Sequence, residues 1–322
     1  MIVAILGAGP AGMSCANACL SFGLTPVVIE RSDQAGGAQR ANFHPNLWLL
    51  GAPDESGAEL SRRLAAHFSG LSGVTLLAAT QVEAVEAAAQ GFRLMLSTPQ
   101  GARVIDVNAI VLATGASPRT TPELEALRAR SARVIVGPLS EAIRDDIHAA
   151  RALILGGGDN ALDHALYLAE RGNRICVCTR AAFSARESLM AACRAHPEIE
   201  LRGQCRPDAL TADALGAEVV WGAERARYDW LLAMFGYRPN TDLVARMAAE
   251  IRPRLEDSGY VVTDAWQRTT VAGIYAAGDV IDNVQPAVAT AIAQGLAAAK
   301  AIERDGKAGR VSSKRRAVPS LL

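Results

Sequence analysis

The sequence has no excess of charge of either sign. Among its 322 residues, Lys and Arg together number 33, and so do Asp and Glu. A chain that binds nucleic acid is typically basic, because it must neutralise phosphates. The balance gives no sign of such a partner, and we expect no nucleic-acid binding.

Long apolar runs and a leader segment are also lacking. No run approaches the roughly 20 apolar residues that a membrane-spanning helix requires. The apolar residues at the N-terminus have no basic segment before them, and they already form an expected strand. We therefore predict no membrane span, no signal peptide and a cytoplasmic protein.

Cysteines at redox or metal-binding spacing are the third absence. The six cysteines are Cys15, Cys19, Cys176, Cys178, Cys193 and Cys205. No two of them form a Cys-x-x-Cys pair, and no set has the spacing of zinc ligands. We interpret them as small buried core residues, with a redox pair as the weaker alternative, and we predict no metal site.

The first thirty residues, in contrast, have the order strand, glycine turn, helix and strand. The apolar start leads into Gly7-Ala-Gly-Pro-Ala-Gly12, a helix is expected over 13–22, and Glu30 ends the next strand. Gly7 permits the tight turn, Gly9 lets a pyrophosphate approach the backbone, and Gly12 lets helix and strand pack closely. The helix N-terminus attracts the pyrophosphate, and the Glu30 carboxylate can accept hydrogen bonds from ribose hydroxyls. The pattern predicts dinucleotide binding.

A second unit of the same kind follows in the middle of the chain. Its strand leads into Gly156-Gly-Gly158-Asp-Asn-Ala161, in which Ala161 takes the packing position. Where the first unit has Glu30, the second has Thr179 and Arg180. A cation at this place suits a 2′-phosphate and favours NADPH over NADH, unless Arg180 is only a solvated strand end.

The rest of the chain suggests how these units are joined. Short strand-like runs over 74–111 predict a small antiparallel sheet, and 116–133 reads as a crossing between domains. An alanine-rich helix is expected over 286–303, with Pro286 in its first turn. At this length we predict two domains of α/β class, each a Rossmann-like fold with a parallel sheet.

The combined motifs resemble one family of flavoproteins over nearly the whole chain. They are Gly7–Gly12 with Glu30, Gly36-Gly37, Ala113-Thr-Gly115, Gly156–Ala161, Gly236-Tyr-Arg-Pro-Asn-Thr241, Ala276-Ala-Gly-Asp279 and Gln285-Pro-Ala-Val-Ala-Thr-Ala. Their order resembles the thioredoxin-reductase-like flavoproteins. The segment 132–147 and Leu47-Trp-Leu-Leu are nearest to the ferredoxin/flavodoxin–NADP reductase branch. The resemblance implies a discontinuous FAD-binding domain, 1–116 with 244–322, and an inserted NAD(P)-binding domain, 117–243.

The resemblance also implies which residues bind the two cofactors, FAD and the exchanging NADPH or NADH. Those implied for FAD are Gly7, Gly9, Pro10, Ala11, Gly12, Glu30, Arg31, Gly37, Gln39, Thr114, Gly115, Gly278, Asp279, Gln285, Pro286 and Ala287. Those implied for NAD(P) are Gly156, Gly158, Asp159, Asn160, Ala161, Thr179 and Arg180. Asp279 would bind the ribityl–phosphate portion, and the helix after Gln285 would stabilise the anion of a reduced flavin.

Two departures from the family pattern limit what it implies. Thioredoxin reductases carry a Cys-x-x-Cys before the second glycine motif, but this chain has no cysteine between Cys19 and Cys176. Disulfide reduction by that route is therefore excluded, and Ala11 stands where bacillithiol-disulfide-reductase relatives have a cysteine. Of three expected coenzyme arginines only Arg180 remains, with Arg186 as a possible substitute. The choice between NADPH and NADH stays open.

These features predict an FAD-dependent NAD(P)H oxidoreductase in which hydride passes from nicotinamide to flavin. The first acceptor expected is an acidic electron-transfer protein, ferredoxin or flavodoxin. The alternatives are a small quinone, nitro compound or oxygen, and a non-catalytic FAD-bound sensor or scaffold. No residue beyond the flavin is required for catalysis, although His44 is a candidate for proton delivery or flavin stacking, with a structural histidine as the alternative. We also expect a homodimer.

Overall fold

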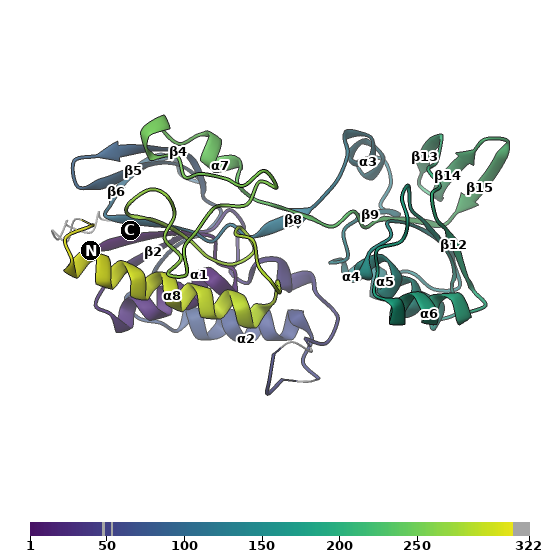
Figure 1. Ribbon diagram of the computed structural model, residues 1–322, viewed down its shortest axis with the longest axis horizontal. Helices are drawn as coiled ribbons and strands as arrows, with labels where there is room; N and C mark the ends of the chain where they lie inside the picture. The colour runs from purple at the N-terminus through teal and green to yellow at the C-terminus, as the bar shows by residue number, and fades with distance from the viewer. Residues whose placement is uncertain (47–48, 53, 312–322) are drawn as a thin grey trace. The chain divides into compact units, whose positions relative to one another are not determined.

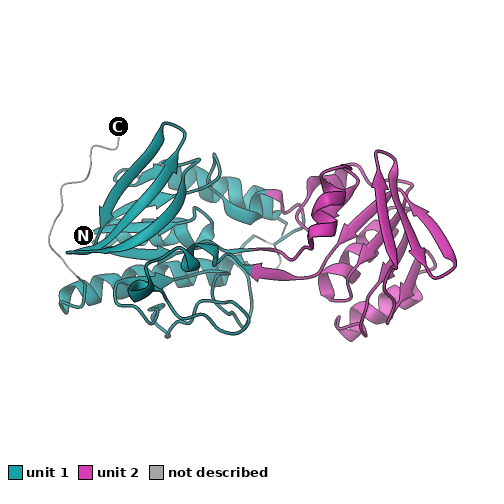
Figure 2. Ribbon diagram, turned by 90° about the horizontal axis from the view of Figure 1, so that it is seen from above, with its two compact units in different colours: residues 1–40, 44–116, 239–322 teal, residues 41–43, 117–238 magenta. Residues whose placement is uncertain are grey.

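The computed structural model describes residues 1–46, 49–52 and 54–311, and it divides into two compact units. Unit 1 comprises Met1–Arg40, His44–Ala116 and the chain from Pro239 onward, and unit 2 comprises Ala41–Phe43 and Ser117–Arg238 (Figure 2). Leu47 and Trp48 of the sequence motif lie outside the described residues. Unit 1 is thus discontinuous in sequence, with the larger part of unit 2 inserted into it.

Unit 1 is built on a parallel five-stranded sheet in the order β18-β7-β1-β2-β3. A second sheet, β4-β5-β6, is antiparallel. The elements are β1 (Ile2–Leu6), α1 (Pro10–Ser21), β2 (Thr25–Ile29), a 3-10 turn (Gly37–Ala41), α2 (Gly57–Ser69), β3 (Thr75–Leu77), β4 (Gln81–Ala88), β5 (Gly91–Thr98), β6 (Gly101–Val107), β7 (Ala109–Leu112), α7 (Asp242–Ala245), a 3-10 turn (Ala249–Ile251), β18 (Ile274–Ala276) and α8 (Val288–Lys307).

Side chains along the buried central strand β1 point alternately to its two faces, and each face belongs to a separate core of unit 1. Ala4 and Leu6 of β1 pack against the antiparallel sheet, whereas Val3 and Ile5 pack against α1 and α8. Successive side chains of a strand point to opposite faces, so a strand that is apolar throughout requires cover on both sides. Helices α1 and α8 lie side by side (Figure 1), and a Cβ at Gly295 would come within 2.2 Å of the carbonyl oxygen of Ala11. Gly295 therefore permits their close approach.

Unit 2 repeats this plan with a parallel sheet in the order β12-β11-β10-β16-β9 and an antiparallel sheet β13-β14-β15. Its elements are α3 (Pro122–Arg128), β9 (Val134–Val136), α4 (Glu141–Asp145), β10 (Arg151–Leu155), α5 (Asp159–Ala169), β11 (Arg174–Cys178), α6 (Glu187–Ala195), β12 (Ile199–Arg202), β13 (Ala209–Asp213), β14 (Gly216–Trp221), β15 (Glu224–Tyr228) and β16 (Trp230–Ala233). Two further strands, β8 (Ala116–Pro118) and β17 (Tyr237–Pro239), pair where the chain passes between the units.

The cysteines occupy the cores, as the sequence predicted. Cys176 and Cys178 share one face of β11 and pack towards the antiparallel sheet of unit 2, and all six cysteines are free thiols. Burial raises the pKa of Cys176 to about 11 and is the main cause that raises that of Cys178 to about 12. Only a thiolate is an effective nucleophile, so these two thiols are poorly reactive at neutral pH.

The predicted α/β architecture with two parallel-sheet units is confirmed, but helix limits differ. Helix α8 begins at Val288, because Ala287 before it is extended; Pro286 therefore precedes the helix, and its expected place in the first turn is wrong. Helix α1 starts earlier than expected, at Pro10, since proline suits a first helical position. Unit 1 resumes at Pro239, against an expected domain boundary at 244. Within the described ranges, no helix combines the length and apolar character that a membrane crossing demands.

Candidate functional site

The glycine turn of unit 1 brings together segments that are distant in sequence. A Cβ at Gly7, whose φ is +111°, would lie 2.3 Å from the carbonyl oxygen of Ala113, next to Thr114. A Cβ at Gly12 would lie 1.9 Å from the carbonyl oxygen of Gly7. Neither position can accept a side chain, so both glycines are required by packing of the turn itself.

Gly9 differs from its neighbours because the protein leaves space beside it. A Cβ there would meet only the Cα of Gly37, at 3.8 Å, an ordinary van der Waals distance. Gly9 is the N-cap of α1 and is followed by Pro10 and Ala11 in the first turn, with no side chain capping the helix. The N–H groups at this end are thus available to an anion.

Glu30 supports the same turn from the end of β2. Its buried carboxylate accepts hydrogen bonds from the backbone N–H of Ala8, at 2.7 Å, and of Ser32, at 2.8 Å. Sequence reasoning assigned this carboxylate to ribose hydroxyls alone, and missed that it also fixes the glycine turn. Carboxylate oxygens have further lone pairs, so both roles are compatible. Arg31 is exposed and Gln39 half-buried.

Thr114 and Gly115 are held by a residue that sequence reasoning did not single out. The Thr114 hydroxyl donates to the carbonyl of Asn240, at 2.7 Å, and the Asn240 amide donates to the carbonyl of Thr114, at 2.8 Å. The backbone N–H of Asn240 also donates to the carbonyl of Gly115. The only sequence signal for Asn240 was its place in the motif that ends at Thr241.

Gly278 lies against the start of α1. A Cβ at Gly278 would be 3.0 Å from the Cβ of Ala11. The Gly278 N–H donates to the side chain of Gln294 on α8, at 2.8 Å, and its carbonyl accepts from Asn283, at 3.1 Å. These contacts link the glycine turn to Glu30 and to Ala113, and they place Gly278 beside the first turn of α1.

Asp279, which follows Gly278 in the chain, has an unusual environment. Its half-buried carboxylate makes no hydrogen bond or ion pair with any residue in the described ranges, and burial raises its pKa. Buried polar groups in proteins normally have partners. The carboxylate is thus an acceptor without a donor in the described part of the protein, of the kind that a hydroxyl-bearing ligand would satisfy.

Further along the chain, Gln285 and Pro286 are exposed and Ala287 is half-buried at the N-cap of α8. The carbonyl of Gln285 accepts a hydrogen bond from the Thr290 hydroxyl, at 2.9 Å. No side chain caps the N-terminus of α8, as at α1, so the first N–H groups of the helix have no capping partner.

Unit 2 has an equivalent turn at the end of β10. Gly156 has a φ of +149°, and a Cβ there would lie 2.4 Å from the carbonyl oxygen of Met234. Gly158 is the N-cap of α5, and a Cβ there would meet only the Ser184 hydroxyl, at 3.8 Å. Asp159 and Asn160 are exposed in the first turn and Ala161 is fully buried. The turn again leaves room for a ligand at its second glycine position.

The loop after β11 folds back over this turn. The N–H groups of Ser184 and Ala185 both donate to the carbonyl of Gly157. Arg186 pairs with Asp159, through its side chain at 2.7 Å and its backbone N–H at 2.8 Å. Arg186 was suggested from the sequence as a substitute for a missing coenzyme arginine, but its guanidinium is already paired with Asp159.

The strand end next to this loop carries the residues expected to choose the coenzyme. Thr179 is buried at the end of β11, and Arg180 after it is exposed. Arg180 makes no hydrogen bond or ion pair with any residue that the structure describes. Its guanidinium is thus available to a ligand.

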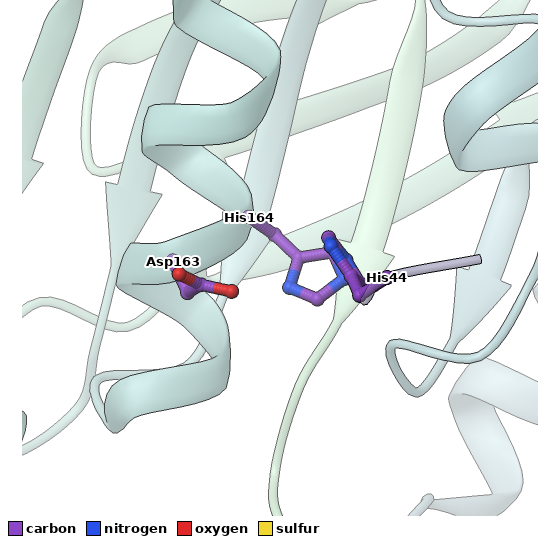
Figure 3. A group of neighbouring side chains, drawn as sticks. All are labelled: His44, Asp163 and His164. Carbon is purple, nitrogen blue, oxygen red and sulfur yellow. The ribbon is translucent and has the colours of Figure 1, made fainter. Parts of the chain in front are cut away.

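Helix α5 also carries Asp163 and His164 on successive positions (Figure 3). His164 is buried, its Nδ1 bonds to the carbonyl of Asn160 at 2.8 Å, and burial lowers its pKa. Its ring meets Phe43 edge to face, with centroids 6.2 Å apart, so the short segment Ala41–Phe43 belongs to unit 2. His44 follows in unit 1, half-buried, with its carbonyl accepting from the N–H of Gly57. A proton-delivery role for His44 stays a prediction.

Comparison with known proteins places these features in context. The profile of one family, described as pyridine nucleotide-disulphide oxidoreductase, matches residues 1–295. A thioredoxin reductase of Rickettsia prowazekii is 26% identical over 310 residues, covering 92% of this chain and 95% of that protein. A ferredoxin–NADP reductase of Lactobacillus delbrueckii subsp. bulgaricus is 26% identical over 298 residues, covering 85% and 86%.

Solved structures show the same architecture. The crystal structure of Lactococcus lactis thioredoxin reductase has a TM-score of 0.75 at 23% identity, covering 94% of this chain and 97% of that one. At this identity the likeness shows the fold alone. The family match and the fold together confirm the resemblance predicted from the motifs.

Proposed function

The chain belongs to the pyridine nucleotide-disulphide oxidoreductase family, and from this premise we propose that it is an FAD-dependent NAD(P)H oxidoreductase whose acceptor is not a disulfide. The observation that carries the proposal is the occurrence, once in each unit, of a glycine turn with an open, uncapped helix N-terminus. Two such turns suit one resident and one exchanging dinucleotide.

The residues present in unit 1 fit FAD. The uncapped end of α1 would receive the pyrophosphate at Gly9, and Glu30, fixed by Ala8 and Ser32, would accept ribose hydroxyls. The Asp279 carboxylate, which has no donor among the described residues, would accept a hydrogen bond from a ribityl hydroxyl. The uncapped N-terminus of α8 would favour negative charge on the flavin ring.

FAD, when bound, supplies the ring that accepts hydride and releases electrons, so the protein's contribution is placement and electrostatics. In unit 2 the coenzyme's pyrophosphate would lie at Gly158, and its adenosine end near Thr179 and Arg180. No proton-transferring side chain is required for hydride transfer. Each unit then binds one cofactor.

The burial of the thiols favours one of the two activities named among the relatives. Reduction of a disulfide acceptor through protein thiols requires a pair of accessible redox cysteines, but Cys15, Cys19 and Cys193 are buried, and so are Cys176 and Cys178. Cys205 is half-buried and its carbonyl accepts from the Cys178 thiol. We therefore propose an acceptor of the ferredoxin or flavodoxin kind, as the Lactobacillus relative's name suggests, with a small quinone, nitro compound or oxygen as the alternative acceptor.

Rapid reduction by a nicotinamide coenzyme tests the proposed function. Purified protein should be yellow, with one FAD per chain, and anaerobic mixing with NADPH or NADH in a stopped-flow instrument should bleach the flavin band. Turnover is then measured with a ferredoxin, a flavodoxin and a quinone in turn. A protein that binds FAD but is not bleached by either coenzyme would instead be the sensor or scaffold.

Removal of every thiol provides a second test. A variant with all six cysteines changed to alanine, if flavin content and melting temperature are preserved, should keep both flavin reduction and acceptor turnover. Alanine is chosen because a serine hydroxyl at these buried sites would lack a partner. A single cysteine variant that retains FAD reduction yet loses acceptor turnover would reveal a redox cysteine and would mean that the protein is a disulfide reductase.

A further inference from the structure

Four arginines lie on or near the strand ends beside the proposed adenosine site of unit 2. They are Arg180, Arg186, Arg202 and Arg206. Arg186 is engaged by Asp159. Arg202 bonds to Glu200, at 2.7 Å, and to Glu224, at 2.8 Å. Arg180 and Arg206, in contrast, are exposed and make no hydrogen bond or ion pair with the described part of the chain.

The backbone brings the segment that ends in Arg206 alongside the segment that contains Arg180. The N–H of Cys205 donates to the carbonyl of Thr179, at 2.9 Å, and the N–H of Gln204 donates to the carbonyl of Ala181, at 3.1 Å. Gln204 adopts a left-handed conformation, with φ of +51°. Arg206 is the next residue after Cys205, so the two arginines without protein partners belong to segments that pair with each other beyond the end of β11.

Unit 1 contains the same backbone arrangement around Glu30. The N–H of Thr80 donates to the carbonyl of Glu30, at 2.9 Å, and the N–H of Ala79 donates to the carbonyl of Ser32, at 2.7 Å. Ala79 also has a left-handed φ, of +47°. By this pattern of bonds Thr179 takes the place of Glu30, and Arg206 takes the place of Gln81.

The residues at these corresponding positions differ between the two units. Arg180 has a counterpart in unit 1, Arg31, so an arginine after the strand does not by itself distinguish the two sites. The exchanges that do so are Thr179 for Glu30, which removes a carboxylate, and Arg206 for Gln81, which adds a cation. A carboxylate suits a free 2′-hydroxyl, and an arginine suits a 2′-phosphate.

We propose that Arg206, acting with Arg180, binds the 2′-phosphate of NADPH and sets the coenzyme preference. The inference rests on the proposed function and adds to it a specificity-determining residue outside the loop that follows β11. Arg206 compensates for the arginines missing from that loop. A guanidinium there can form two parallel hydrogen bonds with a phosphate, while contributing nothing to NADH.

Coenzyme-fragment binding and kinetics on the FAD-loaded protein test the proposal. Arg206→Ala should weaken binding of 2′,5′-ADP, and raise KM for NADPH, by about ten- to a hundredfold, the range for a charged hydrogen bond. Binding of 5′-ADP and KM for NADH should be unchanged. Arg206→Lys should retain much of the affinity because it retains the charge, and Arg180→Ala should show a loss of similar size.

The matched control is Arg225→Ala, an exposed arginine of the same unit whose partner is Glu218; it should leave both coenzymes unaffected. No effect of Arg206→Ala, or an equal effect on both coenzymes, overturns the proposal. A wild-type protein that is reduced efficiently by NADH and does not bind 2′,5′-ADP overturns it while leaving the proposed function intact. A protein that binds neither coenzyme overturns both.

Discussion

Gly9→Val should yield a folded protein that has lost FAD. The wild-type backbone at Gly9 is extended, with φ of −76° and ψ of −177°, and a valine adopts this conformation readily. Its Cβ would have only the Cα of Gly37 nearby, at 3.8 Å, so the protein itself has room for the substitution. The side chain would occupy the approach of the pyrophosphate, which removes the main anchor of the cofactor.

Gly9→Val should abolish FAD binding while lowering the free energy of unfolding only slightly. A valine N-cap costs about 1 kcal/mol relative to a favourable one, whereas blocking the pyrophosphate should abolish stoichiometric flavin binding. Flavin absorbance after desalting, together with circular dichroism, measures the two effects separately. Retention of one FAD per chain by folded Gly9→Val would mean that the pyrophosphate does not lie at this turn.

Gly158→Val is the matched control, because it makes the same change at the N-cap of α5. A Cβ there would meet only the Ser184 hydroxyl, at 3.8 Å. This variant should keep its yellow colour but lose bleaching by NADPH and NADH. Gly12→Ala is the opposite control: its Cβ would lie 1.9 Å from a backbone oxygen, so general misfolding is expected rather than selective loss of flavin.

Asp305→Ala should destabilise unit 1 strongly without any change in the site residues. The Asp305 side chain, 5% exposed, joins α8 to the neighbouring sheet. It accepts two hydrogen bonds from Arg268, at 2.7 and 3.0 Å, and one from the hydroxyl of Tyr275, at 2.8 Å. Its removal leaves a buried hydroxyl and a guanidinium without their main partner, which costs about 3–5 kcal/mol for a buried pair.

Thermal unfolding measures this effect. A loss near the lower end of that range is expected, because Arg268 keeps a contact with Asp264 at 3.4 Å. A loss of about 3 kcal/mol lowers the melting temperature by roughly 6–12 °C in a unit of this size. Glu303→Ala on the same helix, whose partners Lys300 and Lys307 are surface lysines, should change the melting temperature little. Equal shifts for the two variants would refute the special role of Asp305.

The contribution of Asp305 should also depend on pH. Burial alone would raise the pKa of this carboxyl, but the hydrogen bonds from Arg268 and Tyr275 outweigh it and hold the pKa below its usual value. A lowered pKa in the folded state adds stability that is complete above the unfolded pKa of about 4 and is lost as pH falls towards the folded pKa. The stability difference between wild type and Asp305→Ala should therefore be constant above about pH 5 and shrink below about pH 4.

The sequence alone determined the positions of the two glycine turns and the class of fold. A left-handed φ at Gly7, the absent space at Gly12 and the alternation of core residues along β1 all follow from residue type and spacing. These are local properties, because φ limits and side-chain direction depend on a residue and its immediate neighbours. The resemblance to a flavoprotein family could be read for the same reason, from short motifs in a fixed order.

Other features were decided only by the tertiary structure. The hydrogen bonds between Asn240 and Thr114, between Gly278 and Gln294, and between Cys205 and Thr179 join segments that are separated in sequence. Such contacts depend on strand order and on the turns that follow each strand, which local sequence patterns do not specify. The sequence therefore determined where the two glycine turns lie, whereas the packing of distant segments decided which side chains near those turns have no partner in the protein.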